Sequence, residues 1–484
     1  MADFPNEIPL QIDGQSSPAL GGEWVDKYDP HTGQVLCRLA RGKSGDVARA
    51  VEAARIAQTG WAATPPVARG MILLEIVKAL QARKDEVARI VARETGKSLK
   101  DALGEVGAAA QCGLFYAGEG QRLYGRTTTS GTPNKYNMTI RQPVGVAGLV
   151  IAANTPIANV AWKVFPALIC GNGVVLKAAE DTPATSWIFG EIARDAGLPA
   201  GVLNIVQGLG TEAGAALVDH PDVGVVSFTG STRVGKLVGE ACAKRLAKCS
   251  LELGGKNALV VCDDADLELA ATWIAATGFS NAGQRCAAGS RVIAFASIYE
   301  ELKALVLAKT AAQKVGNADS DDFGPVINAR QLQNMTGAVE RAAAEGATVL
   351  AGGSRLDSPG YYLAPTVLEN VDPNAEISRT ELFGPIVCLY RVEGFEAALA
   401  LANDSPYGLT ACLHTRNFSR AHEFVQRVKS GVAVVNAGCH GSEPHMPFGG
   451  VKWSGNGSRE PGTEALDIYS DLKDVYLNTQ VGQL

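Results

Sequence analysis

The sequence lacks a long hydrophobic run, a block of basic residues and an apolar segment near its N-terminus. Its longest wholly apolar run, Val144 to Ala153, has ten residues, whereas a helix needs about 20 to cross a bilayer. The first residues, MADFPNEIPLQIDG, include acidic side chains, so no secretory signal is expected. A net charge of −6 without a Lys/Arg cluster excludes nucleic acid as an expected partner. We therefore expect a cytoplasmic protein with no membrane segment.

The chain also lacks any paired cysteine motif. None of its ten cysteines forms a C-x-x-C pair, and a chain of 484 residues needs no disulfide framework to build a core. Most of these cysteines are predicted to be small buried hydrophobic residues of a reducing compartment, and no metal site is expected. The length is enough for two or three domains.

One cysteine differs from the others in its surroundings. The segment FSNAGQRCAAGSR, residues 279–291, places Cys286 among Arg, Ala and Gly. A cysteine that fills a core normally lies among Leu, Ile and Val. The pattern predicts that the Cys286 thiol is presented to a ligand.

The arrangement of apolar segments predicts the fold class. Residues 46–120 show helical spacing of apolar residues, and residues 125–145 are expected to be extended, as in a hairpin. Short apolar runs separated by amphipathic helices then follow, at 145–151, 173–178, 202–208, 223–230, 257–262, 291–295 and 432–437. Such runs are typical of parallel strands covered on both faces. The tail, residues 464–478, is expected to end in an edge strand that is paired or covered.

Two glycine turns are candidates for phosphate binding. In VSFTGSTRVGK, residues 226–236, an apolar strand runs through Gly230 and Ser231 into a helix start. Free N–H groups and the helix dipole at such a start favour an anion, although Ser231 is equally typical of a helix N-cap. GLGTEAG, residues 208–214, is a second candidate, and no G-x-G-x-x-G motif is present.

Two polar residues border apolar strands. Glu252 lies between leucines in LELGGK, where burial would raise its pKa towards the range of a general base. A carboxylate that caps a helix or pairs with a lysine is the alternative. Asn154 follows a strand, and its amide is suited either to an oxyanion or to capping the next helix.

Seven motifs in a single order carry a resemblance to a known family. They are NTP (154–156), VLKAAE (175–180), SFTGST (227–232), LELGGKN (251–257), FSNAGQRC (279–286), ELFGPIV (381–387) and PFGGVKWSG (447–455). Along nearly its whole length the chain resembles the NAD(P)-dependent aldehyde dehydrogenase family, of the non-acylating type.

The resemblance implies a covalent mechanism. Cys286 corresponds to the nucleophile, which forms a thiohemiacetal and then a thioester. Asn154 corresponds to the oxyanion donor, together with the Cys286 backbone N–H, and Glu252 to the base that activates water. CoA-acylating relatives typically lack this glutamate, so release of a free acid is expected. A CoA-acylating enzyme and a cofactor-independent thiol esterase are the alternatives.

The resemblance also implies a cofactor site for NAD, with NADP as the alternative. Lys177 and Glu180 match the adenosine ribose positions, and a carboxylate there favours NAD. The remaining implied contacts are Ile151, Gly210, Gly214, Thr229, Gly230, Ser231, Leu253, Glu381 and Phe383. Ala153 departs from the family, in which a tryptophan often precedes the asparagine, so one cofactor contact is expected to be missing.

The substrate is expected to be a small polar or aromatic aldehyde. Trp162 and Ala287 are expected to line the pocket, with Arg285 and His440 as its polar residues. Arg285 suits a substrate carboxylate, with a structural ion pair as the alternative. Arg122 is a further candidate for an anion contact.

The resemblance implies an α/β architecture of three parts. A Rossmann-type cofactor domain is expected from residues 1–122 and 144–253, and an α/β catalytic domain from 254–454. Residues 123–143 and 455–484 are expected to form a small β oligomerisation arm. Relatives with such an arm are dimers or dimers of dimers, so a homodimer or homotetramer is expected.

Overall fold

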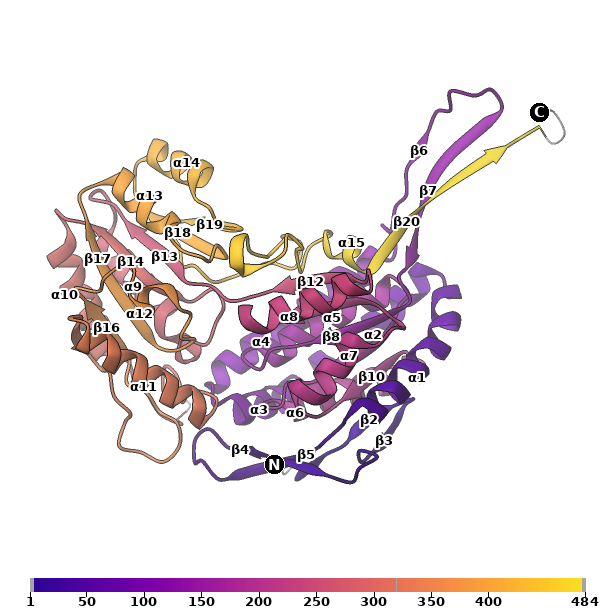
Figure 1. Ribbon diagram of the computed structural model, residues 1–484, viewed down its shortest axis with the longest axis horizontal. Helices are drawn as coiled ribbons and strands as arrows, with labels where there is room; N and C mark the ends of the chain where they lie inside the picture. The colour runs from indigo at the N-terminus through magenta and orange to yellow at the C-terminus, as the bar shows by residue number, and fades with distance from the viewer. Residues whose placement is uncertain (1–3, 319, 481–484) are drawn as a thin grey trace.

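The structure is a computed structural model that describes residues 4–318 and 320–480. It has two lobes, each built on a seven-stranded sheet, and a projecting three-stranded arm (Figure 1). Within the described residues, no helix has both the length and the apolar character needed to cross a membrane.

The first sheet confirms the predicted parallel strands. Its strand order is β12-β11-β8-β9-β10-β2-β3. The strands are β2 (Leu10–Ile12), β3 (Gln15–Ser17), β8 (Val146–Val150), β9 (Gly173–Lys177), β10 (Leu203–Val206), β11 (Val223–Thr229) and β12 (Lys248–Glu252). The five strands from β8 to β12 are parallel, whereas β2 joins antiparallel to β10. Every residue of β8 and β9 is buried, because helices cover both faces.

The helices of this lobe include four from the segment predicted to be helical. They are α1 (Ser44–Ala63), α2 (Pro66–Ala82), α3 (Lys84–Thr95) and α4 (Leu99–Glu119), followed by α5 (Pro156–Ile169), α6 (Pro183–Asp195), α7 (Ala215–Asp219) and α8 (Thr232–Lys244). Residues Gly210–Gly214 form a short π-helical turn before α7. A small sheet of β1 (Glu7–Ile8), β5 (Val35–Ala40) and β4 (Trp24–Tyr28) lies at the edge of the lobe.

The second sheet has the strand order β15-β16-β17-β14-β13-β18-β19. Its strands are β13 (Asn257–Val261), β14 (Gly289–Phe295), β15 (Thr348–Ala351), β16 (Thr366–Glu369), β17 (Ile386–Val392), β18 (Thr410–His414) and β19 (Val432–Val435). Only β15 is antiparallel to its neighbour. The helices are α9 (Leu267–Phe279), α10 (Tyr299–Ala311), α11 (Ala329–Ala344), α12 (Glu376–Arg379), α13 (Phe395–Asn403) and α14 (Phe418–Arg427).

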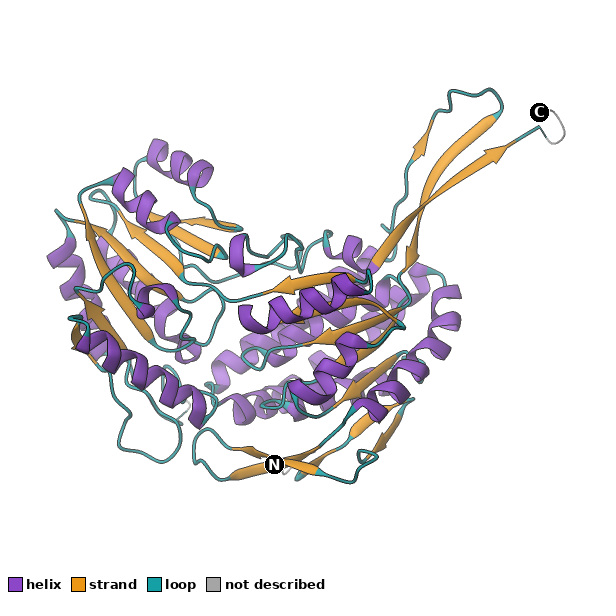
Figure 2. Cartoon of the chain, in the orientation of Figure 1, coloured by secondary structure: helices purple, strands orange, loops and turns teal. Residues whose placement is uncertain are grey.

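The arm is a hairpin joined by the C-terminal strand. β6 (Thr127–Thr128) and β7 (Lys135–Pro143) form the hairpin, and β20 (Ser470–Asn478) pairs antiparallel with the whole of β7. Figure 2 shows these strands extending away from both lobes. The preceding helix α15 (Ala465–Tyr469) instead buries its side chains in the core of the first lobe. The projecting part at the C-terminal end is therefore β20 alone.

The junction of the two lobes lies at the carboxyl ends of parallel strands. Strand β12 ends at Glu252, and after a short loop the chain enters β13 of the second sheet. The Leu253 N–H donates to the Ser454 carbonyl at 3.0 Å, which ties this crossing to the segment before the arm. Strands β8, β9 and β11 end at the same edge, where α/β sheets usually bind ligands.

Candidate active site

Cys286 lies in the loop between the 3₁₀ turn at Ser280–Gly283 and β14. Its carbonyl accepts a hydrogen bond from Asn257 Nδ2 at 2.7 Å. The partly buried thiol packs in a small cluster with Ala287, Leu409, Phe448 and Trp162. This partly buried position is consistent with a thiol presented to a ligand. Eight of the ten free cysteines are instead buried.

The environment of Cys286 favours the neutral thiol. Burial, together with the nearby carboxylates of Glu381 and Glu252, raises the pKa of the Cys286 thiol to about 12. A backbone N–H from Ala287 opposes this shift. Because the thiolate is the nucleophilic form, attack on a substrate requires removal of the thiol proton.

Asn154 directs its amide towards the Cys286 loop. Asn154 Nδ2 donates to the Gln284 carbonyl at 3.0 Å, and its Oδ1 accepts from Asn159 Nδ2 at 3.4 Å. Helix α5 has Thr155, not Asn154, at its N-cap position. The alternative of a helix-capping Asn154 is therefore wrong.

Glu252 is a buried carboxylate at the end of β12 and is only 5 % exposed. Across residues 4–318 and 320–480, neither carboxylate oxygen has a hydrogen-bond partner. Burial raises the pKa of Glu252 well above its usual value, and the Glu460 carboxylate adds to the effect, while Lys163 and Arg459 oppose it. The alternative of a capping or lysine-paired carboxylate is wrong, and the group is suited to accept a proton.

The charges that surround Glu252 belong to a buried network absent from the sequence-based candidates. Lys163 Nζ donates to Glu460 Oε2 at 2.6 Å and to Ser227 Oγ at 2.5 Å. The Tyr469 hydroxyl donates to the other oxygen of Glu460 at 2.6 Å. Lys163 and Glu460 are 297 positions apart in the chain, so the sequence does not indicate that they pair. The one signal in the sequence is a lysine within the largely apolar segment that forms α5.

The residues expected at the adenosine ribose lie together. Lys177 Nζ donates to Glu180 Oε2 at 2.8 Å, with the lysine buried and the carboxylate half exposed. A Cβ atom at Gly210 would lie 4.0 Å from the Glu180 oxygens, and one at Gly214 would lie 4.0 Å from Lys177 Cδ. The two glycines thus leave an open cradle beside a carboxylate, as a ribose requires.

The turn after β11 provides the N-cap of helix α8. Ser231 Oγ accepts from the Val234 N–H at 3.4 Å, so Ser231 is the N-cap of α8. The Gly230 N–H donates to the Glu252 carbonyl at 3.1 Å. Thr229 ends β11, and the apolar side chains of Ile151 and Leu253 are buried beneath this region. The first turn of α8 and the Ser231 hydroxyl proton remain suited to a phosphate.

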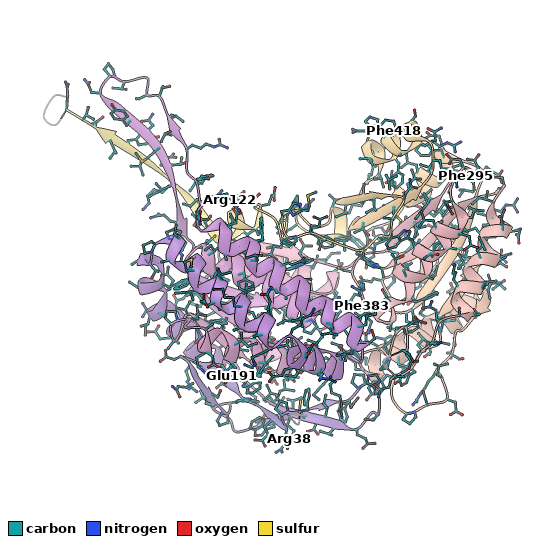
Figure 3. The ribbon with its side chains drawn as sticks, turned by 180° about the vertical axis from the view of Figure 1, so that it is seen from behind. Arg38, Arg122, Glu191, Phe295, Phe383 and Phe418 are labelled. Atoms are coloured by element: carbon teal, nitrogen blue, oxygen red, sulfur yellow. The ribbon has the colours of Figure 1, made fainter. Side chains whose placement is uncertain are left out.

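Glu381 and Phe383 lie beside the Cys286 loop in the second lobe. Glu381 Oε1 accepts from the Gly255 N–H at 2.9 Å, and burial raises the pKa of Glu381 to about 7. Phe383, labelled in Figure 3, has a φ of +60°. Both residues line one cleft with Gly255 and Arg285. Glu381 and Phe383, expected at the nicotinamide end of a dinucleotide, therefore lie beside the Cys286 loop. Lys177 and Glu180, expected at the adenosine end, lie at the carboxyl end of β9.

The expected substrate residues divide into an apolar and a polar group. The Trp162 and Phe448 rings lie 5.5 Å apart beside Cys286, and Ala287 belongs to the same cluster. Arg285 lies 3.8 Å from an Asp101 oxygen, which is an ion pair rather than a hydrogen bond. Burial, together with the charge of Arg285, lowers the pKa of His440 to about 4, so this imidazole is neutral at pH 7.

Arg122 is not grouped with these residues. It follows α4, pairs with Glu119 of that helix and is half exposed. Figure 3 shows it near the base of the arm, while Phe383 lies nearer the second lobe. The ion pair accounts for its position.

Among the residues that the structure describes, no group of three or more His, Cys, Asp or Glu side chains is arranged to hold a metal ion. The fold and the site together define a two-lobed α/β enzyme with a cysteine, an unpartnered carboxylate and a nucleotide-type cradle at the junction of its sheets.

Comparison with known proteins identifies the family. The sequence model of the aldehyde dehydrogenase family matches residues 18–475. The chain is 37 % identical to α-ketoglutaric semialdehyde dehydrogenase of Bacillus subtilis, covering 96 % of this chain and 97 % of that one. It is also 37 % identical to the mitochondrial benzaldehyde dehydrogenase of Antirrhinum majus, over 96 % of this chain and 88 % of that one. The chain belongs to the aldehyde dehydrogenase family.

Solved structures agree with this assignment. Betaine aldehyde dehydrogenase of Staphylococcus aureus, in complex with NAD⁺, superposes with a TM-score of 0.96 at 31 % identity, covering 98 % of this chain and 95 % of that one. A variant of aldehyde dehydrogenase from Bacillus cereus gives a TM-score of 0.96 at 34 % identity, over 98 % and 97 % of the two chains. The predicted family, the aldehyde dehydrogenase-like fold and the oxidoreductase class are confirmed.

Proposed function

We propose that the protein oxidises an aldehyde to the carboxylic acid with NAD as cofactor, through Cys286 as nucleophile and Glu252 as general base. The observation that carries the proposal is the buried, unpartnered Glu252 carboxylate close enough to Cys286 to raise the pKa of its thiol. The Asn154 amide approaches the same loop from a third segment. These are the three groups that acyl transfer through a thiol requires.

The roles of the residues follow from their positions. The Cys286 thiol passes its proton to solvent as the sulfur forms a bond to the aldehyde carbon, and the carbonyl oxygen takes the negative charge as a thiohemiacetal oxyanion. Asn154 Nδ2 and the Cys286 backbone N–H donate to that oxygen. Bound NAD supplies the hydride acceptor of the reaction. Glu252 then takes a proton from water, whose oxygen attacks the thioester carbon as the carbon–sulfur bond breaks. The acid is released, and the proton held by Glu252 returns to the Cys286 sulfur.

The cofactor residues support NAD over NADP. Glu180 places a carboxylate at the open cradle, where it accepts from ribose hydroxyls and repels a 2′-phosphate. Thr229, Gly230 and Ser231 would hold the pyrophosphate, with Ile151 and Leu253 beneath it. Glu381 and Phe383 would hold the nicotinamide ribose and ring. We assign residues 1–122 and 144–253 to the cofactor domain and residues 254–454 to the catalytic domain.

The function is tested by following reduced nicotinamide formed by the purified protein from a panel of aldehydes, without CoA, with NAD and with NADP. We expect turnover with NAD and a free acid as product. Turnover that begins only when CoA is added would support a CoA-acylating enzyme. Ester cleavage without any aldehyde oxidation would support a thiol esterase.

The polar side of the pocket favours an aldehyde with a polar or aromatic group over a long alkyl chain. Arg285 beside Asp101 leaves its Nε without a partner in the described part of the chain, and the nearby His440 is neutral. Relatives named for α-ketoglutaric semialdehyde and for benzaldehyde are both consistent with such a pocket. Trp162 and Ala287 would form its apolar wall.

We expect Arg285→Met to lower the preference for carboxylate-bearing over alkyl aldehydes by about tenfold or more, because a hydrogen bond to a charged group contributes roughly 1.5–3 kcal/mol. The measurement is kcat/KM for a semialdehyde and for an alkyl aldehyde of equal length. Arg122→Met is the matched control, since that arginine pairs with Glu119. An unchanged ratio in Arg285→Met would mean that Arg285 serves only its ion pair with Asp101.

The proposed enzyme is cytoplasmic, and its arm supports a homodimer or homotetramer. Leu472 and Tyr476 lie four positions apart on one face of β20 and are 62 % and 60 % exposed. Strand β20 ends the three-stranded sheet, so its outer edge has no partner strand in the described chain. We therefore propose that residues 123–143 and the strand within 455–484 contact a second copy.

The double variant Leu472→Arg/Tyr476→Arg is expected to shift the protein to a smaller species in light scattering, because it replaces two exposed apolar side chains of the arm with charged ones. The variant Lys473→Arg, on the opposite face, is the control and should keep the size of the wild type. An unchanged mass in the double variant would exclude the arm from the interface.

A further inference from the structure

A buried ion pair lies directly beside Asn154. Lys97 follows α3 and Glu105 lies in the second turn of α4, and their side chains are 2 % and 5 % exposed. The Lys97 Nζ and Glu105 Oε2 atoms are 2.5 Å apart. A buried pair of this kind is costly to desolvate and is weak evidence for stability by itself, so its other contacts decide what it does.

Lys97 holds the peptide carbonyl of Asn154. Its Nζ donates to that oxygen at 2.7 Å, and Asn281 Nδ2 donates to the same oxygen at 3.2 Å. Asn281 also donates to the Gln284 carbonyl, the group that accepts from the Asn154 amide. The Asn154 carbonyl is thus held by one donor from the loop between α3 and α4 and by another from the 3₁₀ turn that precedes Cys286.

Glu105 holds the helix that follows Asn154. Its Oε1 accepts from the Ile157 N–H at 2.9 Å and from the Ala158 N–H at 3.3 Å. The first N–H groups of a helix have no partner within it, and Thr155 makes no side-chain cap in the described structure. Glu105 therefore caps α5 from a neighbouring helix, and its charge suits the positive end of the helix dipole.

We infer that Lys97 and Glu105 are positioning residues that fix the Asn154 amide for the thiohemiacetal oxyanion. Lys97 binds the carbonyl of Asn154 itself, and Glu105 binds the first turn of α5, which begins two residues later. Both contacts are made to the backbone that carries the Asn154 side chain, so the proposed effect on the reaction is a geometric one. This inference rests on the oxyanion role proposed above for Asn154.

A double-mutant cycle tests the inference, with kcat and the aldehyde KM measured for Lys97→Met, Asn154→Ala and the double variant. Loss of one oxyanion donor lowers kcat by roughly 10²–10³-fold, which is the loss expected for Asn154→Ala. A misplacement of about 1 Å costs on the order of 10²-fold, so Lys97→Met should lower kcat by about 10- to 100-fold with little change in KM. The double variant should be no slower than Asn154→Ala, because no amide is left to misplace. Multiplying losses would overturn the inference.

Lys97→Arg keeps a donor and should recover part of the lost kcat. Glu105→Gln gives the same cycle through the other partner and replaces Lys97→Met if that variant fails to fold. Its matched control is Glu94→Gln, since Glu94 is also fully buried and accepts from the Ala184 and Thr185 N–H groups at the start of α6, at 2.5 and 2.9 Å.

Both glutamine variants should lower the melting temperature, but only Glu105→Gln should show a loss of kcat that disappears in the Asn154→Ala background. Losses that multiply in both would assign Glu105 a purely structural role and overturn the inference. An unchanged kcat in Asn154→Ala alone would instead overturn the proposed oxyanion donor, so the two failures are distinguishable.

Discussion

Replacing Cys286 with alanine is expected to abolish aldehyde oxidation, with kcat lowered by about 10⁴-fold or more. The sulfur forms the only covalent bond between the protein and the substrate in the proposed reaction, and no other nucleophile takes its place in the surrounding cluster of Ala287, Leu409, Phe448 and Trp162. The measurement is the rate of reduced nicotinamide formation at saturating aldehyde and NAD.

The control for this variant is Cys249→Ala, because Cys249 is the only other cysteine of the described chain that is partly exposed. That variant should keep the rate of the wild type. Equal losses in the two variants would point to a general effect of removing thiols and would contradict the assignment of Cys286 as nucleophile.

The pH dependence of alkylation gives a second measurement on the same residue. Burial and the carboxylates of Glu381 and Glu252 raise the pKa of Cys286 to about 12, so the thiolate fraction rises about tenfold for each pH unit below that value. Iodoacetamide should therefore label Cys286 slowly at pH 7 and progressively faster towards pH 10. A rate that is already at its maximum at pH 7 would contradict the raised pKa.

Local patterns were sufficient to predict several of the parallel strands and the helices between residues 46 and 120. The apolar runs that become β8, β9 and β11 are buried on both faces, so their composition alone identifies them. The addition of β2 and β3 to the far edge of the first sheet was not predictable in this way. Both strands are three residues long and carry no strong period.

Contacts between distant segments account for what the sequence did not reveal at the site. The two leucine neighbours of Glu252 suggested burial but left a capped or lysine-paired carboxylate open. The buried lysine of this region, Lys163, instead bonds to Glu460, which lies 297 positions after it in the chain. Lys97 and Glu105 look like ordinary helix-surface residues in the sequence, and only the packing of α4 against α5 brings them to Asn154. A charged residue becomes informative once its burial is known.

Replacing Glu252 with glutamine is expected to stop turnover after one round. A general base contributes roughly 10²–10⁴-fold, and that loss should fall on hydrolysis of the Cys286 thioester. Rapid mixing with aldehyde and NAD should therefore show a burst of about one reduced nicotinamide per active site, followed by a rate lowered by that factor. Hydroxylamine, which needs no base to attack a thioester, should restore turnover. Loss of the burst as well would place Glu252 before the thioester, at removal of the Cys286 proton.

The same substitution should change how stability depends on pH. Burial and the Glu460 carboxylate raise the pKa of Glu252 in the folded protein well above its unfolded value. The folded state therefore binds the proton more tightly, and stability falls as pH rises from the unfolded pKa through the folded one. Glu252→Gln carries no titrating group, so its melting temperature should exceed that of the wild type by a margin that grows over this range. A margin independent of pH would mean that Glu252 is not buried as a carboxylate, and the base that hydrolyses the thioester would have to be sought elsewhere.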